Sequence, residues 1–206
     1  MAEQHLPENI RNLYEVYDYR HAIGILHTEF PDLFQEICTV LENFRLTNEM
    51  IITPGGNESE IPKVFSRHLR PLNWVEGVLN ARVIIDDNVE VRSETHKIDY
   101  VKDRIAFDLE WNSKDQTFDR DLYAFRAFFD YHKISVGILV TRATALQEYF
   151  STLGTYTDRY GTQRLIQSKY GASTTHMDKL VPRLEAGRSG GCPVLALGIT
   201  TALIED

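Results

Sequence analysis

Apolar side chains at spacings of three and four residues predict helices in the first part of the chain. The pattern covers Glu8–His27, with an interruption near Asp18, and resumes over Asp32–Phe44 after a break at Pro31. We therefore expect two helices near the N-terminus, followed by a third around Lys63–Leu69.

The middle of the chain alternates between apolar and polar residues, which predicts two successive hairpins. Ala81–Ile85 and Val89–Arg92 would form the first hairpin. Lys97–Val101 and Arg104–Trp111 would form the second, with a turn at Lys102-Asp103.

Beyond the second hairpin, helical and strand patterns follow one another. A stripe of phenylalanine and leucine predicts a helix that Thr117 or Asp119 could cap and that runs to about His132. Apolar runs then predict two strands buried on both faces, separated by a short helix and a loop-rich region: Ile134–Val140, helix Ala143–Leu153, and Pro193–Thr200. This order favours a right-handed crossover in a single α/β domain with a central mixed β-sheet flanked by helices.

The chain is acidic, but the charge is unevenly distributed. The net charge is −8, and residues 1–60 alone hold eleven acidic and three basic residues, so the remainder is neutral overall. Residues 155–190 hold six basic and three acidic residues. A basic segment at residues 155–190 is compatible with a local phosphate-binding face, and an ordinary solvated surface explains the charges equally well.

Composition argues against several classes of protein. No apolar run approaches the roughly 20 residues of a membrane span, so we expect no membrane partner. Cys38 and Cys192 lack the spacing of zinc ligands. The acidic N-terminal sequence lacks the features of a signal peptide and cysteines are few, so we expect a cytoplasmic location.

Three carboxylates gather on one face of the second predicted hairpin. Because side chains alternate along a strand, Asp108 and Glu110 share a face with Ala106, and a two-residue turn would bring Asp99 opposite Ala106. Like charges so close together need a cation or a shared proton. Hard oxygen ligands on strands suit Mg²⁺ or Mn²⁺, while an exposed strand face that happens to be acidic explains the pattern equally well.

Residues 99–110, DYVKDRIAFDLE, resemble the active-site hairpin of PD-(D/E)XK nucleases, and specifically of type II restriction endonucleases of the BglII/BstYI group. The nine-residue step from Asp99 to Asp108 matches that group without a gap. Tyr19–Phe44 resembles its N-terminal region, and Gly187–Ile199 resembles its closing Gly-rich turn and strand. The resemblance implies a restriction-endonuclease-like fold.

The resemblance also implies roles for individual residues. Asp99 stands at the first acid of the family and Asp108 at the second, which is usually Glu in this group. Glu110 stands where the group has Gln and the superfamily has Lys, so the third position is BamHI-like and acidic. It could act as metal ligand, general base or polar anchor for water. Glu76 resembles an extra acid that these enzymes contribute from a preceding helix.

Other interpretations of these residues stay open. Asp99, Glu110 and Asn112 could form the motif in a second register, but that alignment requires an insertion, and Asn cannot act as a base. Glu76 could simply lie on the solvated side of a helix. Lys114 shares the parity of the strand and could supply a cation near the acids.

A type II restriction endonuclease is the function that the resemblance implies. Such a hydrolase uses Mg²⁺, which Mn²⁺ can replace, and makes double-strand cuts in DNA at a specific, palindromic site. We expect a homodimer, with a cognate DNA methyltransferase as genetic partner. A repair or modification-dependent nuclease of the same fold, and a catalytically silent DNA-binding protein, are the alternatives.

Three parts make up the expected domain. They are N-terminal helices at residues 8–45, a catalytic α/β core at residues 61–153, and a loop-rich DNA-recognition region with the last core strand at residues 154–206. Side chains of the last part could bind phosphates or purine edges, although solubility is an equally common role for such residues. The candidates are Arg159, Gln163, Arg164, Lys169 and Arg188.

Overall fold

A six-stranded mixed sheet forms the centre of the protein. The structure, a computed structural model, describes residues 2–53, 59–86, 89–94, 96–158 and 160–205. In spatial order the strands are β1 (Tyr14–Tyr19), β11 (Val194–Ile199), β8 (Val136–Arg142), β7 (Ile105–Leu109), β6 (Ile98–Lys102) and β3 (Val75–Gly77). β11, β8 and β7 run parallel, whereas β1, β6 and β3 pair antiparallel with their neighbours. The mixed sheet confirms the predicted fold class.

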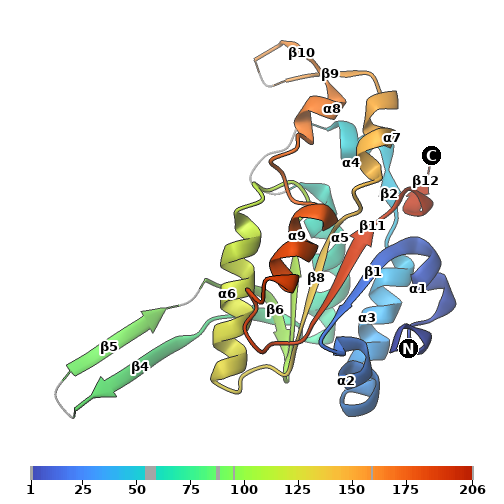
Figure 1. Ribbon diagram of the computed structural model, residues 1–206. Coiled ribbons are helices and arrows are strands. Elements are labelled where there is room, and N and C mark those ends of the chain that lie inside the picture. Colours follow the sequence, from blue (N-terminus) through green and yellow to red (C-terminus); the bar gives the residue numbers. More distant parts are fainter. Residues whose placement is uncertain (1, 54–58, 87–88, 95, 159, 206) are drawn as a thin grey trace.

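Helices cover both faces of this sheet (Figure 1). One layer contains α1 (Glu8–Leu13), α2 (Ala22–Glu29), α3 (Pro31–Asn43) and α5 (Glu60–Leu69). The other layer contains α6 (Thr117–Asp130) and α9 (Met177–Glu185). Because side chains alternate along β7, Phe107 joins the core of the first layer and Ala106 joins the core of the second. Every residue of β7, β8 and β11 is buried. The apolar runs predict this burial for β8 and β11, whereas the alternating pattern of β7 does not.

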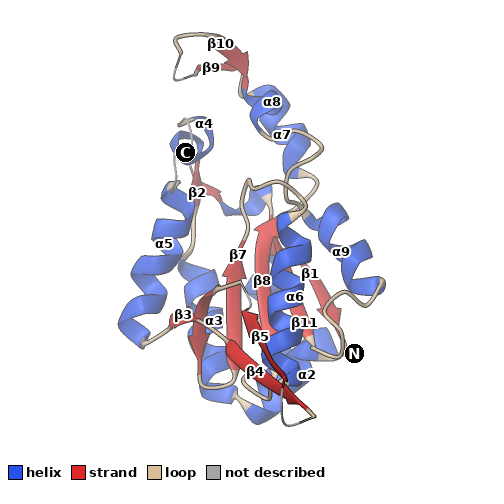
Figure 2. Ribbon diagram, turned by 90° about the vertical axis from the view of Figure 1, so that its left-hand side faces the viewer, coloured by secondary structure: helices blue, strands red, loops and turns tan. Residues whose placement is uncertain are grey.

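Smaller elements extend from this core. α7 (Leu146–Thr152), β9 (Thr155–Thr157), β10 (Gln163–Leu165) and α8 (Ile166–Lys169) gather beyond the carboxyl ends of β7 and β8 (Figure 2). β4 (Asn80–Ile85) and β5 (Val89–Glu94) form the predicted first hairpin, which projects from the body (Figure 1). The remaining short elements are η1 (Ala2–His5), β2 (Leu46–Thr47), α4 (Asn48–Ile52), η2 (Arg70–Leu72), η3 (Thr201–Leu203) and β12 (Ile204–Glu205). Within the described residues, no helix is long and apolar enough to cross a membrane.

The prediction of one N-terminal helix over Glu8–His27 is wrong. α1 ends at Leu13, Tyr14–Tyr19 forms strand β1 along the edge of β11, and α2 starts at Ala22. Pairing with an open sheet edge overrides the helical spacing of the apolar residues, which is common for β-prone tyrosine and valine. Asp18 then accepts a hydrogen bond from the backbone N–H of Ile23, which fixes the entry into α2.

The turn of the central hairpin lies one residue later than predicted. Lys102 pairs with Ile105 and Val101 pairs with Ala106, so the turn is Asp103-Arg104. Asp103 has a φ of 49°, which aspartate tolerates better than most residues. Continuing this register sets Asp99 opposite Asp108, not opposite Ala106. Both alignments keep the acids on one face because they differ by two residues.

Two further predictions need correction. Neither Thr117 nor Asp119 caps α6: Gln116 is its N-cap residue, and Asp119 instead contacts Arg183. The weakly periodic region 154–189 also contains a helix, α9, that the sequence pattern did not predict. Its Met177, Leu180 and Leu184 are buried against the sheet, so this part of the chain completes the second layer.

Packing between α6 and β8 predicts the effect of an added methyl group at Gly137. A Cβ atom there would lie 2.5 Å from the Phe125 ring, so Gly137→Ala should lower the free energy of unfolding by about 1–3 kcal/mol. Urea unfolding measures the change. Gly24→Ala in α2 is the matched control, because an added Cβ meets nothing within 4 Å there. Equal midpoints for Gly137→Ala and the unchanged protein would contradict the packing.

Candidate active site

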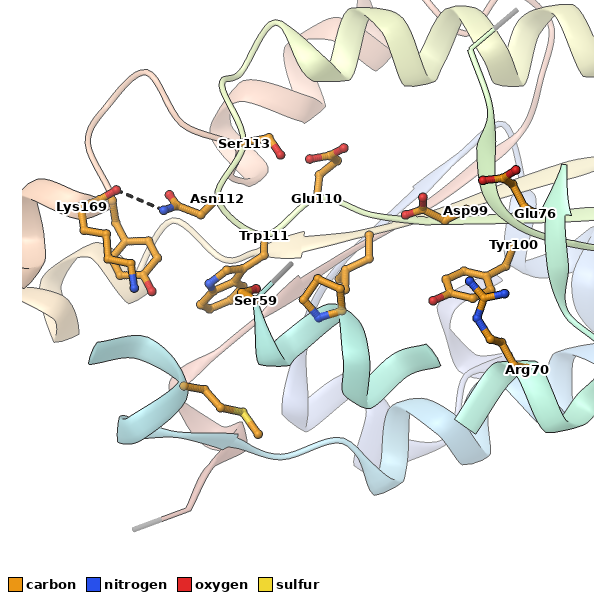
Figure 3. A pocket seen from close by; sticks show the side chains of 14 residues that line it. Ser59, Arg70, Glu76, Asp99, Tyr100, Glu110, Trp111, Asn112, Ser113 and Lys169 are labelled. Atoms are coloured by element: carbon orange, nitrogen blue, oxygen red, sulfur yellow. Dashed lines mark hydrogen bonds between the residues drawn. The ribbon is translucent and has the colours of Figure 1, made fainter. Parts of the chain in front are cut away.

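Three of the four predicted acids line a pocket of about 380 Å³ at the carboxyl end of β7. Asp99 comes from β6, Glu110 directly follows β7, and Glu76 comes from β3. Figure 3 shows these three carboxylates along one side of the pocket, with Arg70 and Tyr100 near one end and Lys169 at the other. Residues that are far apart in the sequence therefore share one opening.

Asp108 lies behind this row of acids. Its side chain is about 4% exposed, and its Oδ1 accepts a hydrogen bond of 2.7 Å from the backbone N–H of Asp99. Its Oδ2 is buried and has no hydrogen-bond partner among the described residues. A buried carboxylate oxygen without a partner is costly, so Asp108 is under electrostatic strain in the absence of a cation or a proton.

The backbone fixes Glu110 to the neighbouring strand. Its N–H donates to the carbonyl of Val140, and its carbonyl accepts from the hydroxyl of Thr141. The side chain is about 12% exposed and lies 3.3 Å from Nη2 of Arg120. Glu110 is therefore held at the pocket by β8 from one side and by a cation from α6 on the other.

Asp121 is an additional acid that the sequence analysis missed. It lies on α6, is about 2% exposed, and its Oδ1 accepts from Nε and Nη2 of Arg120. The helical spacing contains the signal, because Asp121 falls three residues after Phe118 and four before Phe125 on the buried stripe. A carboxylate at such a position must face the core or a polar cluster.

All four acids of this cluster have raised pKa values. Burial is the main cause for Asp99, Asp108, Glu110 and Asp121, and repulsion between the acids adds to it. Asp99 keeps contact with solvent, yet the surrounding protein displaces part of its water. Burial followed by repulsion from Glu110 raises the pKa of Asp121 to about 8. Asp121 thus holds a proton near neutral pH unless a cation compensates its charge.

Glu76 reaches the pocket from a strand, so the prediction that it lies on a helix is wrong. It belongs to β3, and its Oε1 accepts from Nζ of Lys97 at 2.7 Å. The pairing partly neutralises Glu76 at the edge of the pocket. Asn112, the third member of the alternative register, donates to the carbonyl of Lys169 and so points away from Asp99 (Figure 3). Asp108 contacts the backbone of Asp99 but does not line the pocket, whereas Asn112 does, so the choice between the two registers stays a prediction.

Basic candidates differ in how freely they could reach a ligand. Lys169 donates to the carbonyls of Ile51 and Thr53, and burial lowers its pKa to about 8, so it ties α8 to the end of α4. Arg188 contacts Asp119. These two side chains serve the protein's own packing in this structure.

The other basic candidates lie on exposed parts of the fold. Gln163 and Arg164 belong to β10, and Arg164 pairs with Asp158 at 2.6 Å. Lys114 is exposed and bridges Thr174 through the backbone, outside the pocket lining. Arg159 lies outside the described residues. The sequence analysis also missed Arg70, which lines the pocket; its Nε donates to Ser66, and its guanidinium lies 5.7 Å from the Tyr100 ring centre.

A mixed sheet whose central hairpin delivers acids to a pocket defines a restriction-endonuclease-like α/β protein. Comparison with family models agrees: the model of the restriction endonuclease BglII/BglIII family matches residues 14–199. The chain therefore belongs to this family, which makes it a hydrolase that cleaves DNA at specific sites. A comparison with curated protein sequences gives no match.

Raised acid pKa values predict that stability falls as the pH rises. Between the ordinary pKa near 4 and the raised values, the folded protein keeps protons that the unfolded chain has released. The free energy of unfolding should therefore drop from pH 5 to pH 8, on the order of 1–3 kcal/mol. Asp121→Asn should flatten this dependence, because the amide carries no ionisable proton.

Urea unfolding at the two pH values tests this expectation. Asp130→Asn is the control, since Asp130 is exposed near the end of the same helix and pairs with Arg126. A stability that rises toward pH 8, or an equal fall in Asp121→Asn, would refute the burial of protonated acids.

Proposed function

We propose that the protein is a Mg²⁺-dependent type II restriction endonuclease that cuts both strands of a palindromic DNA site. The observation that carries this proposal is the unpartnered, buried Oδ2 of Asp108 beside Asp99 and Glu110. Asp108 stands on β7 and Glu110 directly follows it; β7 and its neighbour β8 are fully buried, so these acids can hold a fixed geometry around a phosphodiester.

The donor set suits a hard divalent cation. No three acidic, histidine or cysteine side chains of the described residues already form a metal-binding group. The raised pKa values and the orphaned oxygen nevertheless fit a site that a cation would complete. Asp99, Asp108 and Glu110 would hold Mg²⁺ or Mn²⁺, with Glu76 at the edge. When bound, the cation supplies charge neutralisation at phosphorus and a more acidic water.

The protein's own side chains orient the reactants. Asp99 and Glu110 face the pocket, while Asp108 fixes the backbone of Asp99 through its hydrogen bond. Glu110 can accept a proton from the attacking water, and Arg120 beside it stabilises its charged form. Hydrolysis in line would leave a 5′-phosphate and a 3′-hydroxyl, as expected for the family.

Base reading and assembly complete the proposal. The β9–β10 hairpin lies beyond the carboxyl end of the sheet, where Gln163 and Arg164 are exposed (Figure 2). Lys114 and Arg159 are further candidate phosphate contacts, whereas Lys169 and Arg188 would have to leave their present partners. A homodimer would bring one acidic hairpin to each DNA strand, and a cognate DNA methyltransferase would protect the host's own sites.

Removing the charge of Asp108 should abolish cleavage. Asp108→Asn should lower the rate of plasmid cleavage in Mg²⁺ by at least about a hundredfold, because the acid cluster loses its buried carboxylate. Asp103→Asn is the matched control in the same hairpin: Asp103 is exposed in the turn, and asparagine tolerates its positive φ. Sequencing fragment ends from unmethylated DNA gives the site and the cut position. Equal rates for Asp108→Asn and the unchanged protein would refute the mechanism.

Arg70 should contribute to DNA binding. Its guanidinium lies at the pocket that contains the acids and is held by Ser66 and Tyr100, so it can meet a phosphate with little loss of entropy. Arg70→Gln should weaken binding and reduce the slope of log affinity against log salt by about 1. Fluorescence anisotropy with a DNA duplex in Ca²⁺ measures both quantities.

Lys63→Gln is the comparison variant for Arg70. Lys63 is an exposed cation on the same helical segment but lies outside the pocket lining. If both substitutions change the salt slope equally, Arg70 has no special role in holding the DNA.

A further inference from the structure

The strongest cluster outside the family's acidic hairpin joins Arg120 and Asp121 to Glu110. Nε and Nη2 of Arg120 each lie 3.1 Å from Oδ1 of Asp121, and the same Nη2 lies 3.3 Å from Oε1 of Glu110. One guanidinium nitrogen therefore bridges two carboxylates from different elements. The contact links helix α6 to the end of strand β7.

This arrangement is specific, because neighbouring residues on a helix do not normally face each other. Arg120 is half exposed, with 46% of its side chain accessible, and a free arginine there would sample many rotamers. Instead it bends back over Asp121, which is about 2% exposed among the apolar residues of α6. The buried carboxylate thus determines where the exposed guanidinium lies.

Asp121 lies outside the pocket lining but hydrogen-bonds Glu110, which does line the pocket. Arg120 ties the two acids together, because its Nη2 contacts a carboxylate oxygen of each. Fixing one oxygen of Glu110 also fixes the plane of the carboxylate, and with it the direction of the second oxygen. A carboxylate that must accept a proton from water benefits from such a fixed orientation.

We infer that Asp121 is a positioning residue that holds the Arg120 guanidinium against Glu110, and thereby sets the orientation of Glu110 for the proposed hydrolysis. This inference rests on the proposed function of the pocket. It adds a residue of the second helical layer to the machinery, which the hairpin motif does not contain. Asparagine at position 121 would keep an oxygen for Arg120, whereas leucine would keep the volume and lose the contact.

A double-mutant cycle on cleavage separates positioning from simple packing. Asp121→Leu and Arg120→Gln should each lower the single-turnover cleavage rate by about ten- to a hundredfold, while DNA affinity in Ca²⁺ stays within about twofold. The double variant should be no slower than the slower single variant, because Asp121 acts through Arg120. Asp121→Asn should restore most of the rate, and Asp130→Leu, an exposed site on the same helix, should leave it unchanged.

A second readout needs neither DNA nor a metal. In carbon-13 nuclear magnetic resonance of labelled glutamate carboxyls at one fixed pH, the Glu110 resonance should shift in Asp121→Leu and in Arg120→Gln, with no larger shift in the double variant. Rate losses that multiply in the cycle, or an unchanged Glu110 resonance in Asp121→Leu, would overturn the inference. Failure of the proposed function would look different, since cleavage would then survive Asp108→Asn.

Discussion

Crowding of carboxylates at the end of a buried strand is the constraint on which this structure depends. Asp108 sits among atoms that exclude water, and its one internal partner is the backbone N–H of Asp99 within the described chain. Such a group raises the energy of the folded state unless its charge is removed or compensated. The fold tolerates it because the surrounding strands are fully buried and densely packed, so the apolar core offsets the local penalty. The same rigid packing holds the acids close together, although their mutual repulsion would otherwise move them apart.

Side chains from both helical layers reach the cluster of acids. Arg120 and Asp121 belong to α6, which packs on one face of the sheet, whereas Arg70 follows α5, which packs on the other. The acids themselves come from the sheet between the layers. The pocket is therefore complete only when both layers are in place, and a mutation that loosens either layer would displace a charged group at the site. This dependence explains why the candidate site adjoins the hydrophobic clusters on both faces of the sheet.

Sequence pattern predicted the parts of the fold that follow from local periodicity. The face shared by Asp99, Asp108 and Glu110 was predicted correctly although the turn was misplaced, because the misalignment of two residues preserves the alternation of side chains. Apolar runs in the sequence predicted strands β8 and β11. No such pattern predicted strand β1, since its formation depends on pairing with an edge of β11 that is distant in the sequence. The sequence pattern also could not predict the contacts of Lys169, because it donates to the backbone carbonyls of Ile51 and Thr53, more than a hundred residues away.

An acidic protein that acts on DNA must present its few suitable cations locally, because long-range repulsion of phosphates is screened within about 10 Å at moderate salt. Several arginines here are already paired with acids, as Arg164 is with Asp158 and Arg183 is with Asp119. Such pairs hold a guanidinium in place without committing all of its donors. A phosphate that approaches can then bind the remaining donors with little further ordering of the side chain. Under this view the net charge of −8 and DNA cleavage are compatible. The acidic partners orient the arginines, so that the charge of the whole chain does not decide where a phosphate can bind.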